Sequence, residues 1–349
     1  MTSGAALVQV CPAGSGGVRD YAQCLHEAWT QRGVASSVIE AAPPVAGTPG
    51  LHARLEALAR PCAGRLEVVL HFSGYGYARR GLCLWLVDEL RAFKARHGER
   101  ARLTVVFHEL FAIGVPWRSA FWLAPIQSLI ARRLAGLADR LWTNTGHHAR
   151  WLRAAAGPAK AIDMRPVFST IGEPPGLPPW PTRHPRLVVF GSASTRARAL
   201  HALRGREDRL HGLGITELVE VGAGAPQIRD AGPWPTRHAG RLPVSELREL
   251  LLASRFGLLD YPARHLGKSS VLAAYAAHGC VAIDTCADGR SADGLAVGTH
   301  VLRLGEALPV AADAWAGTAQ RLAHWYRDHT LARQADEMLA RLTAADNVS

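Results

Sequence analysis

EVVLHF (67–72) and LTVVFH (103–108) are two short apolar runs, and a helical pattern over residues 82–97 lies between them. Such runs are typical of strands that are buried on both faces, and a helix between two of them indicates that the strands are parallel. The same alternation extends along the first half of the chain. Apolar runs recur at 5–10, 34–40 and 140–144, and helical patterns at 18–32, 119–137 and 147–155.

The segment STIGEPPGLPPWPTRHP (169–185) interrupts this alternation, because proline continues neither a helix nor a central strand. The alternation then starts again. Apolar runs follow at 186–191, 216–222, 256–260, 280–284 and 300–304, with helical patterns at 196–209, 244–254, from about 268, and from 311 to about 345.

We therefore predict an α/β protein with two Rossmann-like doubly wound domains that face each other across a cleft. The predicted boundaries are 1–168 for the N-terminal domain, 169–185 for a Pro-rich linker, 186–325 for the C-terminal domain, and 326–349 for a terminal helix that packs back across the domains.

Composition predicts a cytoplasmic globular protein. The chain has 349 residues, of which 48% are hydrophobic, and its mean hydropathy is +0.01. No stretch reaches the roughly 18 apolar residues that a membrane span needs, and the N-terminus lacks the pattern of a signal peptide. The six cysteines include no CxxC pair, so we expect buried thiols and no metal site.

The net charge of +11 favours anionic partners. The sequence contains neither a clustered basic stripe nor a recognisable nucleic-acid module, so no nucleic-acid partner is expected. Phosphorylated small molecules and a membrane surface remain as partners. The segment with Trp117, Phe121, Trp122, Ile126 and Ile130 has the apolar character to rest on a membrane or to receive a lipid chain, although such a stripe is more often part of a core.

In the first half, three groups of residues lie where strands end and ligands bind in such sheets. Gly16 and Gly17 belong to a Gly-rich turn after the first strand, which either approaches an anion at a helix N-terminus or is an ordinary turn. His108 and Glu109 follow a buried strand and are the candidate catalytic pair, with a hydrogen-bonded strand-end histidine as the alternative. Tyr75, Tyr77 and Arg79 form an aromatic and basic loop that suits an acceptor sugar.

In the second half, Lys268, Ser269 and Ser270 open a predicted helix, and this combination suits a diphosphate. A P-loop is excluded because Pro262 stands where its first glycine is needed. Further candidates for donor binding follow the first two strands of this half: Arg196, Arg198 and Gly222. The alternatives are an N-cap serine, a solvated helix face and a plain turn.

The chain resembles the family 4 branch of the GT-B glycosyltransferases over most of its length. The matching segments are GSGGVRDYAQCLHEAWTQRG, VVFHE, ADRLWTNTGHHARWLRAAA, SELRELLLASRFGLLDYP, VLAAYAAHGCVAIDT and WYRDHTLARQA. The resemblance implies that the C-terminal half binds a nucleotide-diphosphate sugar, that the N-terminal half binds the acceptor, and that no metal or cofactor is required. It also implies that Gly16 and Gly17 approach the donor phosphates and that His108 lies beside the transferred sugar.

One departure from the family concerns two glutamates that its members carry eight positions apart at the donor-binding helix. Leu266 and Ala274 stand at those places in this chain. Either a divergent subgroup binds its donor through Gly267, Lys268 and Ser269, or catalysis has been lost. We prefer the first interpretation, because a helix start with a glycine, a lysine and two hydroxyls retains the chemistry for binding a diphosphate.

The function expected from the sequence is sugar transfer to a hydroxyl of a glycan or lipid-linked acceptor, in polysaccharide or glycoconjugate biosynthesis. Retention at the anomeric carbon follows from the resemblance, while inversion with Glu109 as base stays open. The alternatives are a catalytically inactive GT-B-like binding or scaffold protein and a dinucleotide-dependent oxidoreductase. The last is disfavoured because neither half contains GxGxxG. Contact with the inner face of the plasma membrane also stays open.

Overall fold

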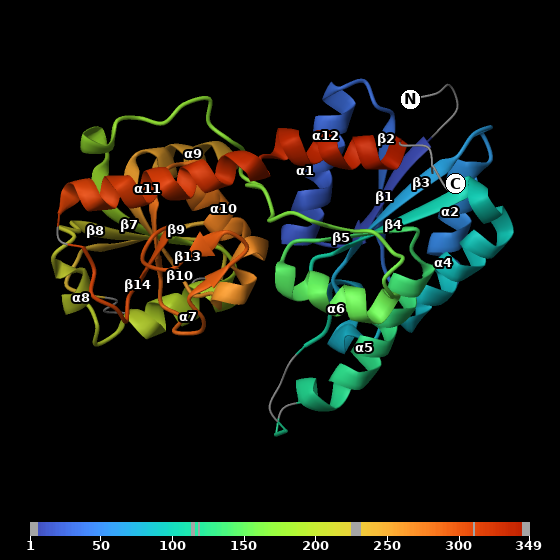
Figure 1. Cartoon of the computed structure of the whole chain (residues 1–349), viewed down its shortest axis with the longest axis horizontal. Helices are drawn as coiled ribbons and strands as arrows, with labels where there is room; N and C mark the ends of the chain where they lie inside the picture. Colours follow the sequence, from blue (N-terminus) through green and yellow to red (C-terminus); the bar gives the residue numbers. More distant parts are fainter. Residues whose placement is uncertain (1–5, 113–115, 118, 225–231, 310, 344–349) are drawn as a thin grey trace. The chain divides into compact units, whose positions relative to one another are not determined.

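The computed structural model describes residues 6–112, 116–117, 119–224, 232–309 and 311–343. The chain forms two compact units: unit 1 comprises Met1–Arg165 and Leu331–Ser349, and unit 2 comprises Pro166–Thr330. Each unit contains a six-stranded sheet with helices packed against it (Figure 1). The prediction of two doubly wound α/β domains is therefore confirmed.

The sheet of unit 1 is parallel throughout, with strand order β2-β1-β3-β4-β5-β6. The order reverses between β1 and β3, so these two central strands lie side by side and the chain departs from them in opposite directions. The strands are β1 (Ala6–Pro12), β2 (Ser36–Ala41), β3 (Leu66–Phe72), β4 (Ala101–Phe107), β5 (Arg140–Thr143) and β6 (Ile162–Met164). The helices between them are α1 (Gly17–Gln31), α2 (Leu51–Ala59), α3 (Gly74–Tyr77), α4 (Leu84–His97), α5 (Ser119–Leu137) and α6 (Gly146–Ala156).

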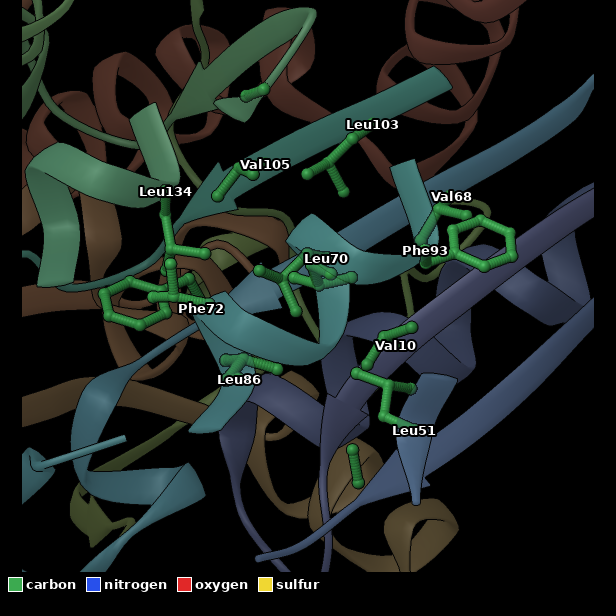
Figure 2. Packing of buried hydrophobic residues seen from close by; sticks show 14 of the residues in the cluster. Val10, Leu51, Val68, Leu70, Phe72, Leu86, Phe93, Leu103, Val105 and Leu134 are labelled. Atoms are coloured by element: carbon green, nitrogen blue, oxygen red, sulfur yellow. The ribbon is translucent and has the colours of Figure 1, made fainter. Parts of the chain in front are cut away.

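The core of unit 1 forms because alternate strand residues point to the same face of the sheet. Figure 2 shows Val10, Leu70, Phe72 and Val105 from three strands in one such layer, where they are buried with Leu86 and other residues of the covering helices. His71 lies between Leu70 and Phe72 in β3 and therefore points to the opposite face. Helix α1 packs on that face, since the Tyr21 ring of α1 contacts the His71 ring.

The main sheet of unit 2 is also parallel, with strand order β14-β11-β10-β7-β8-β9. Here the order reverses between β7 and β10. The strands are β7 (His184–Phe190), β8 (Glu217–Val221), β9 (Thr236–Gly240), β10 (Ser254–Leu259), β11 (Val281–Asp284) and β14 (Val301–Arg303), with β12 (Ser291–Ala292) and β13 (Leu295–Ala296) in a separate antiparallel pair. The helices are α7 (Ala193–Leu203), α8 (Asp208–His211), α9 (Val244–Leu252), α10 (Ser270–Ala277) and α11 (Ala312–Tyr326).

Helix α10 is held against the sheet of unit 2 by Tyr275. The Tyr275 hydroxyl lies 2.8 Å from the carbonyl oxygen of Val188 and 3.0 Å from that of Leu258, on the two strands that flank the reversal of strand order. A side chain at Gly257 would collide with the Tyr275 ring. Gly257 therefore allows α10 to lie close to β7 and β10. This packing positions the N-terminus of α10 relative to the sheet.

The last helix, α12 (Leu331–Thr343), belongs to unit 1. The Trp29 indole N–H donates a hydrogen bond of 3.0 Å to the Ala335 carbonyl, and Arg32 pairs with Asp336 at 2.6 Å. The helical stretch expected from 311 to 345 is not continuous, because a 3-10 turn at Arg327–His329 and the extended backbone of Thr330 separate α11 from α12. Residues 344–349 lie outside the described residues.

The Pro-rich segment 169–185, which the sequence indicated to be a linker, lies within unit 2. The Ser169 N–H donates to the Tyr326 hydroxyl at 2.7 Å, and Arg183 donates to the His278 carbonyl at 2.8 Å. The chain passes from unit 1 to unit 2 between Arg165 and Pro166. No helix in the described ranges combines the length and the apolar character that crossing a bilayer requires.

Candidate functional site

The reversal of strand order locates the candidate site in each unit. In open parallel sheets, ligands bind at the carboxyl ends of the strands, at the point where the order reverses. In unit 1 this point is formed by the segments after β1 and β3, and in unit 2 by the segments after β7 and β10. The residues predicted from the sequence can be judged by whether they lie at these points.

The Gly-rich turn after β1 lies at the reversal point of unit 1 and is open. A Cβ added at Gly14, Gly16 or Gly17 would meet no atom within 4 Å, and Gly14 has a φ of +94°, in the left-handed region that favours glycine. The neighbouring Arg19 is paired with Glu40 at 2.5 Å, and this pairing lowers the pKa of the Glu40 carboxyl. The turn therefore leaves room for a ligand beside the N-terminus of α1.

His108 follows β4 and is buried, with 7% of its surface exposed. Its Nε2 atom lies 3.3 Å from Nδ1 of His71, and the two rings are stacked at an angle of 26°. Nε2 of His71 lies 2.8 Å from the Gln9 side-chain oxygen. Three adjacent strands thus contribute one polar side chain each to a row that ends at the carboxyl edge of the sheet.

This row of side chains constrains the protonation of both histidines. Burial lowers the pKa of His71 well below its usual value, so this ring is neutral at physiological pH. Nε2 of His71 faces the Gln9 side chain and its Nδ1 faces Nε2 of His108, so the neutral ring donates one of these hydrogen bonds and accepts the other. His71 therefore holds the His108 ring in one orientation.

Tyr21 connects this row to two helices. Its ring packs edge-on against His108, with centroids 4.8 Å apart, and its hydroxyl donates to the Gln334 side-chain oxygen at 2.9 Å. Tyr21 lies one turn after Gly17 in α1, so the same helix supports both the open glycine turn and the buried histidine. Gln334 comes from α12, which makes the C-terminal segment part of the surroundings of His108.

Glu109 and two of the three residues predicted to contact an acceptor lie at the surface nearby. Glu109 is exposed and accepts a hydrogen bond of 2.9 Å from the Ser73 hydroxyl after β3. Tyr75 is 49% exposed, and Arg79 is also exposed. Tyr77 is a correction, because it is only 1% exposed and its hydroxyl lies 3.1 Å from the Val10 carbonyl and 3.0 Å from the His71 carbonyl. It is a core residue that fixes the loop after β3.

In unit 2, helices α7 and α10 begin close together at the reversal point. A Cβ at Gly191, directly after β7, would lie 3.1 Å from a methyl carbon of Val271 in the first turn of α10. Ser192 and Ser269 are the N-caps: their hydroxyls accept hydrogen bonds from the N–H groups of Thr195 and Leu272. Lys268 directly precedes the second cap and is partly exposed, as is Ser270. Two helix N-termini with a lysine form a suitable place for phosphates.

Arg196 is a second correction. The sequence placed it among donor-binding residues, but its side chain is fully buried and paired with the buried carboxylate of Glu220. It also donates hydrogen bonds to the carbonyls of Gly191 and Ala223. A side chain at Gly222 would collide with the Arg196 guanidinium, so Gly222 makes room for this arginine. The buried guanidinium and the space left by Gly222 thus hold the loops after β7 and β8 in place.

Arg198 lies on the exposed side of α7 and spans the reversal point. It pairs with Asp260, which directly follows β10, at 3.0 Å. The other oxygen of Asp260 accepts a hydrogen bond of 2.9 Å from Thr285 after β11. Asp260 is not among the residues predicted from the sequence, although its place directly after the apolar run FGLL was the available signal.

Asp284 at the end of β11 is fully buried, and burial raises its pKa to about 7. One of its oxygens accepts hydrogen bonds of 3.0 Å from the N–H groups of Tyr261 and Cys286. Below about pH 7 the folded protein therefore holds Asp284 as the neutral acid, and its hydrogen bonds connect the loops after β10 and β11.

The elevated pKa of Asp284 predicts a pH dependence of stability. The unfolded chain loses this proton near pH 4 and the folded chain near pH 7, so the free energy of unfolding falls as the pH rises between these values. We expect Asp284→Asn, which keeps the accepting oxygen, to match the wild type at pH 4 and to exceed it by roughly 2–4 kcal/mol above pH 7. Urea unfolding over this pH range measures the difference. Asp313→Asn, at an exposed position, controls for net charge, and a gain in the Asp284→Asn variant that does not vary with pH would contradict the assignment.

Among the described residues, no group of three or more His, Cys, Asp or Glu side chains is arranged to hold a metal ion. Within unit 1 the structure brings His108 and Glu109 close to the loop with Tyr75 and Arg79, and α1 connects them to the glycine turn. Within unit 2 it brings Arg198 to the same edge of the sheet as Lys268, Ser269 and Ser270.

These two sheets, with flanking helices and a reversal of strand order in each, constitute the GT-B fold of two Rossmann-like domains. No protein-family model matches the chain, and no curated protein matches it in sequence. Solved structures match it along nearly its whole length. An alpha-glucosyltransferase (AGT) in complex with UDP has a TM-score of 0.61 and 10% sequence identity, and the match covers 98% of this chain and 100% of that chain.

A second similar structure is the alpha,alpha-trehalose 6-phosphate synthase from Burkholderia multivorans, with a TM-score of 0.61 and 12% identity over 98% of this chain and 96% of that one. A third similar structure is described as trehalose-6-phosphate from E. coli bound with UDP-2-fluoro glucose. It has a TM-score of 0.60 and 10% sequence identity, and the match covers 97% of this chain and 99% of that chain. At sequence identities this low, the similarity establishes the fold of this chain but not its activity. The activity has to be inferred from the residues of this chain.

Proposed function

We propose that this protein transfers a sugar from a nucleotide-diphosphate sugar to a hydroxyl of a glycan or lipid-linked acceptor in polysaccharide or glycoconjugate biosynthesis. The observation on which the proposal rests is the paired start of α7 and α10 at the reversal point of unit 2, with Lys268 beside it. The alpha-glucosyltransferase and the E. coli protein of the same fold were solved with UDP and with UDP-2-fluoro glucose.

In this proposal unit 2 binds the donor. The partial positive charge at the start of α10, the hydroxyl of Ser270 and the ammonium group of Lys268 neutralise the diphosphate, while Ser269 keeps the helix start in place. Arg198 contacts the donor from the exposed side of α7. Cationic groups and helix ends supply the charge stabilisation that a metal ion supplies elsewhere, so the reaction needs neither a metal nor a cofactor.

Unit 1 supplies the residues around the transferred sugar. His108, held by His71, contacts the sugar. Gly16 and Gly17 allow the phosphates of the donor to approach α1. Glu109, Tyr75 and Arg79 bind the acceptor from the exposed loops. The expected outcome is retention at the anomeric carbon; inversion would require Glu109 to take the proton of the acceptor hydroxyl.

One observation favours a second candidate, a binding or scaffold protein of the same fold without catalysis. Leu266 and Ala274, which stand where the resemblance to the family 4 glycosyltransferases would place two glutamates, are buried at 2% and 1% exposure. They leave no carboxylate at those positions to orient a donor sugar. Such a protein would bind the nucleotide and leave the sugar attached.

Calorimetry and thermal unfolding with UDP, GDP, ADP and NAD separate these functions, followed by release of UDP from UDP-sugars with and without acceptors. Binding of a nucleoside diphosphate with turnover supports sugar transfer, and binding without turnover supports the scaffold. Stabilisation by NAD alone would overturn both.

An alpha-glucosyltransferase of the same fold was also solved with UDP-glucose and DNA containing an abasic site. The expected absence of a nucleic-acid partner for this chain therefore stays a prediction. Adding duplex DNA to the same assay checks it.

Lys268→Gln is expected to weaken binding of the nucleoside diphosphate by at least about 10-fold, because a charge-assisted hydrogen bond to phosphate contributes roughly 1.5–3 kcal/mol. Arg209→Gln is the matched control, since it removes one positive charge from the exposed helix α8 before β8, away from the carboxyl edge. Titration calorimetry measures both. Equal weakening by the two variants would mean that only net charge matters and that Lys268 does not contact the diphosphate.

A further inference from the structure

Helix α5 has two apolar faces, of which the structure covers one. Ile130, Ala131, Leu134 and Ala135 are buried in the core of unit 1. On the other side, Phe121, Trp122, Ile126 and Leu129 are 41%, 70%, 41% and 43% exposed. They follow one another at helical spacing, so they form a single stripe, and the same side of the helix continues to the exposed Arg132 and Arg133. These six exposed residues are called the α5 face.

A pocket of about 520 Å³ opens on this face. It is lined by Phe111, Ala112, Phe121, Trp122, Ala124, Pro125 and Ser128, of which only the serine has a polar side chain. Phe111 and Ala112 follow His108 and Glu109 closely in the chain. An apolar hollow of this size beside exposed aromatic residues offers room for hydrocarbon and little for a polar ligand.

The loop after β3 extends the same surface. The side-chain nitrogen of Gln127, in α5, donates to the Arg80 carbonyl at 2.7 Å and to the Tyr75 hydroxyl at 3.3 Å, which fixes the loop against the helix. Tyr75, Leu82 and Leu84 are 49%, 36% and 37% exposed. Large apolar side chains from two separate segments are therefore exposed together.

All the charges on these two segments are positive. Residues 73–87 and 110–138 contain no aspartate or glutamate, whereas Arg79, Arg80, Arg132 and Arg133 are exposed on them. A second copy of the chain is a poor occupant, because a two-fold contact through this surface would place like charges against each other. Duplex DNA would match the charge but not the exposed Phe, Trp and Ile side chains.

We infer that the α5 face and the loop at residues 75–84 bind the surface of an anionic lipid bilayer. Trp122 and Phe121 enter the boundary between headgroups and acyl chains, where amphipathic aromatic rings are stable. The four arginines contact anionic headgroups, whose surface potential attracts basic residues. This inference goes beyond the proposed sugar transfer and does not rest on it.

Sedimentation with lipid vesicles tests the inference on the full-length protein. We expect binding to vesicles of phosphatidylcholine with phosphatidylglycerol, much weaker binding to phosphatidylcholine alone, and a blue shift of tryptophan fluorescence on binding. Phe121→Ser with Trp122→Ser should weaken binding at least about 10-fold, and Arg79→Glu with Arg133→Glu should do the same in a salt-dependent manner. Val45→Ser with Val244→Ser removes two exposed apolar side chains elsewhere and should leave binding unchanged.

Several outcomes would overturn the inference. These are equal binding by all variants, no preference for anionic vesicles, a dimer that is lost in the Phe121/Trp122 variant, or a DNA complex that is lost in it. All of the altered side chains are exposed, so thermal unfolding should show that every variant folds. The vesicle assay contains no nucleotide or sugar, and its result is therefore independent of whether the protein transfers a sugar.

Discussion

Arg196→Met is expected to lower the free energy of unfolding by about 3–5 kcal/mol, because it leaves the carboxylate of Glu220 buried without its main partner. Both side chains of this ion pair are fully buried, and the only other ion-pair partner of Glu220 among the described residues is His238, at 3.0 Å. The variant also removes the donors for the Gly191 and Ala223 carbonyls. Urea unfolding monitored by tryptophan fluorescence measures the loss.

The matched control is Arg198→Met, two positions along the same helix. Arg198 is half exposed and its ion pair with Asp260 lies at the surface, so its loss should change stability by no more than about 1 kcal/mol. Adding Glu220→Gln to Arg196→Met should restore part of the stability, since it removes the unpaired charge. A stable Arg196→Met protein that fails to bind a nucleoside diphosphate would instead support a direct contact between Arg196 and the donor.

His108→Ala is expected to lower the rate of sugar transfer by about 100- to 1,000-fold, as loss of a positioned catalytic group typically does. The structure holds His108 beside Tyr21 and His71 at the carboxyl edge of unit 1. His71→Ala should have a smaller effect, about 10-fold, because His71 orients His108 without contacting substrate. The rate of UDP release with acceptor present measures both effects.

His97→Ala serves as the control for this pair. His97 is a partly buried histidine of the same unit that hydrogen-bonds to Glu56 at 2.7 Å, at the end of α4 and near the opposite edge of the sheet. Its removal perturbs packing to a similar extent but should leave transfer unchanged. Wild-type turnover by His108→Ala, with His97→Ala equally active, would remove His108 from the proposed mechanism and leave the fold and the donor site unaffected.

The parts of the fold that follow from the sequence are the strands buried on both faces. β3, β4, β7 and β10 each contain an apolar run, and a parallel sheet covered by helices requires such runs. Two of the edge strands, β6 and β9, gave no such signal. β9 has the polar sequence TRHAG and is partly exposed, and β6 has three residues. Helix α2 was not anticipated, although Leu51, Leu55 and Ala59 are spaced to form its buried face.

Residues of the candidate site could be predicted from the sequence where their place at the end of a strand or the start of a helix puts them in the site. His108, Glu109, Ser269 and Ser270 lie at the ends of elements, and strand ends and helix starts can be read from apolar periodicity. Partnership between charged residues cannot be read in this way. Nothing local to Arg196 indicates that its partner is Glu220, because the pair forms only when β8 lies beside β7.

Tyr77 illustrates the same limit. In sequence it stands one residue after Gly76 in an aromatic and basic loop, much like Tyr75, yet Tyr77 is buried and Tyr75 exposed. The difference arises because the loop forms a single helical turn, α3, whose two tyrosines point in different directions. The roles of Gln9 and His71 were missed for a related reason, since a polar residue inside an apolar run gives no indication of which other strand its side chain will meet.

The return of α12 to the first unit has a consequence for biosynthesis. On a translating ribosome, residues 166–330 are complete before Gln334, Ala335, Met338 and Leu342 emerge to cover α1. The second unit can therefore reach its native state while the first, although made earlier, still exposes the side chains of Tyr21 and Trp29. During synthesis, the first unit would therefore need protection by chaperones for longer than the second, although its residues leave the ribosome first.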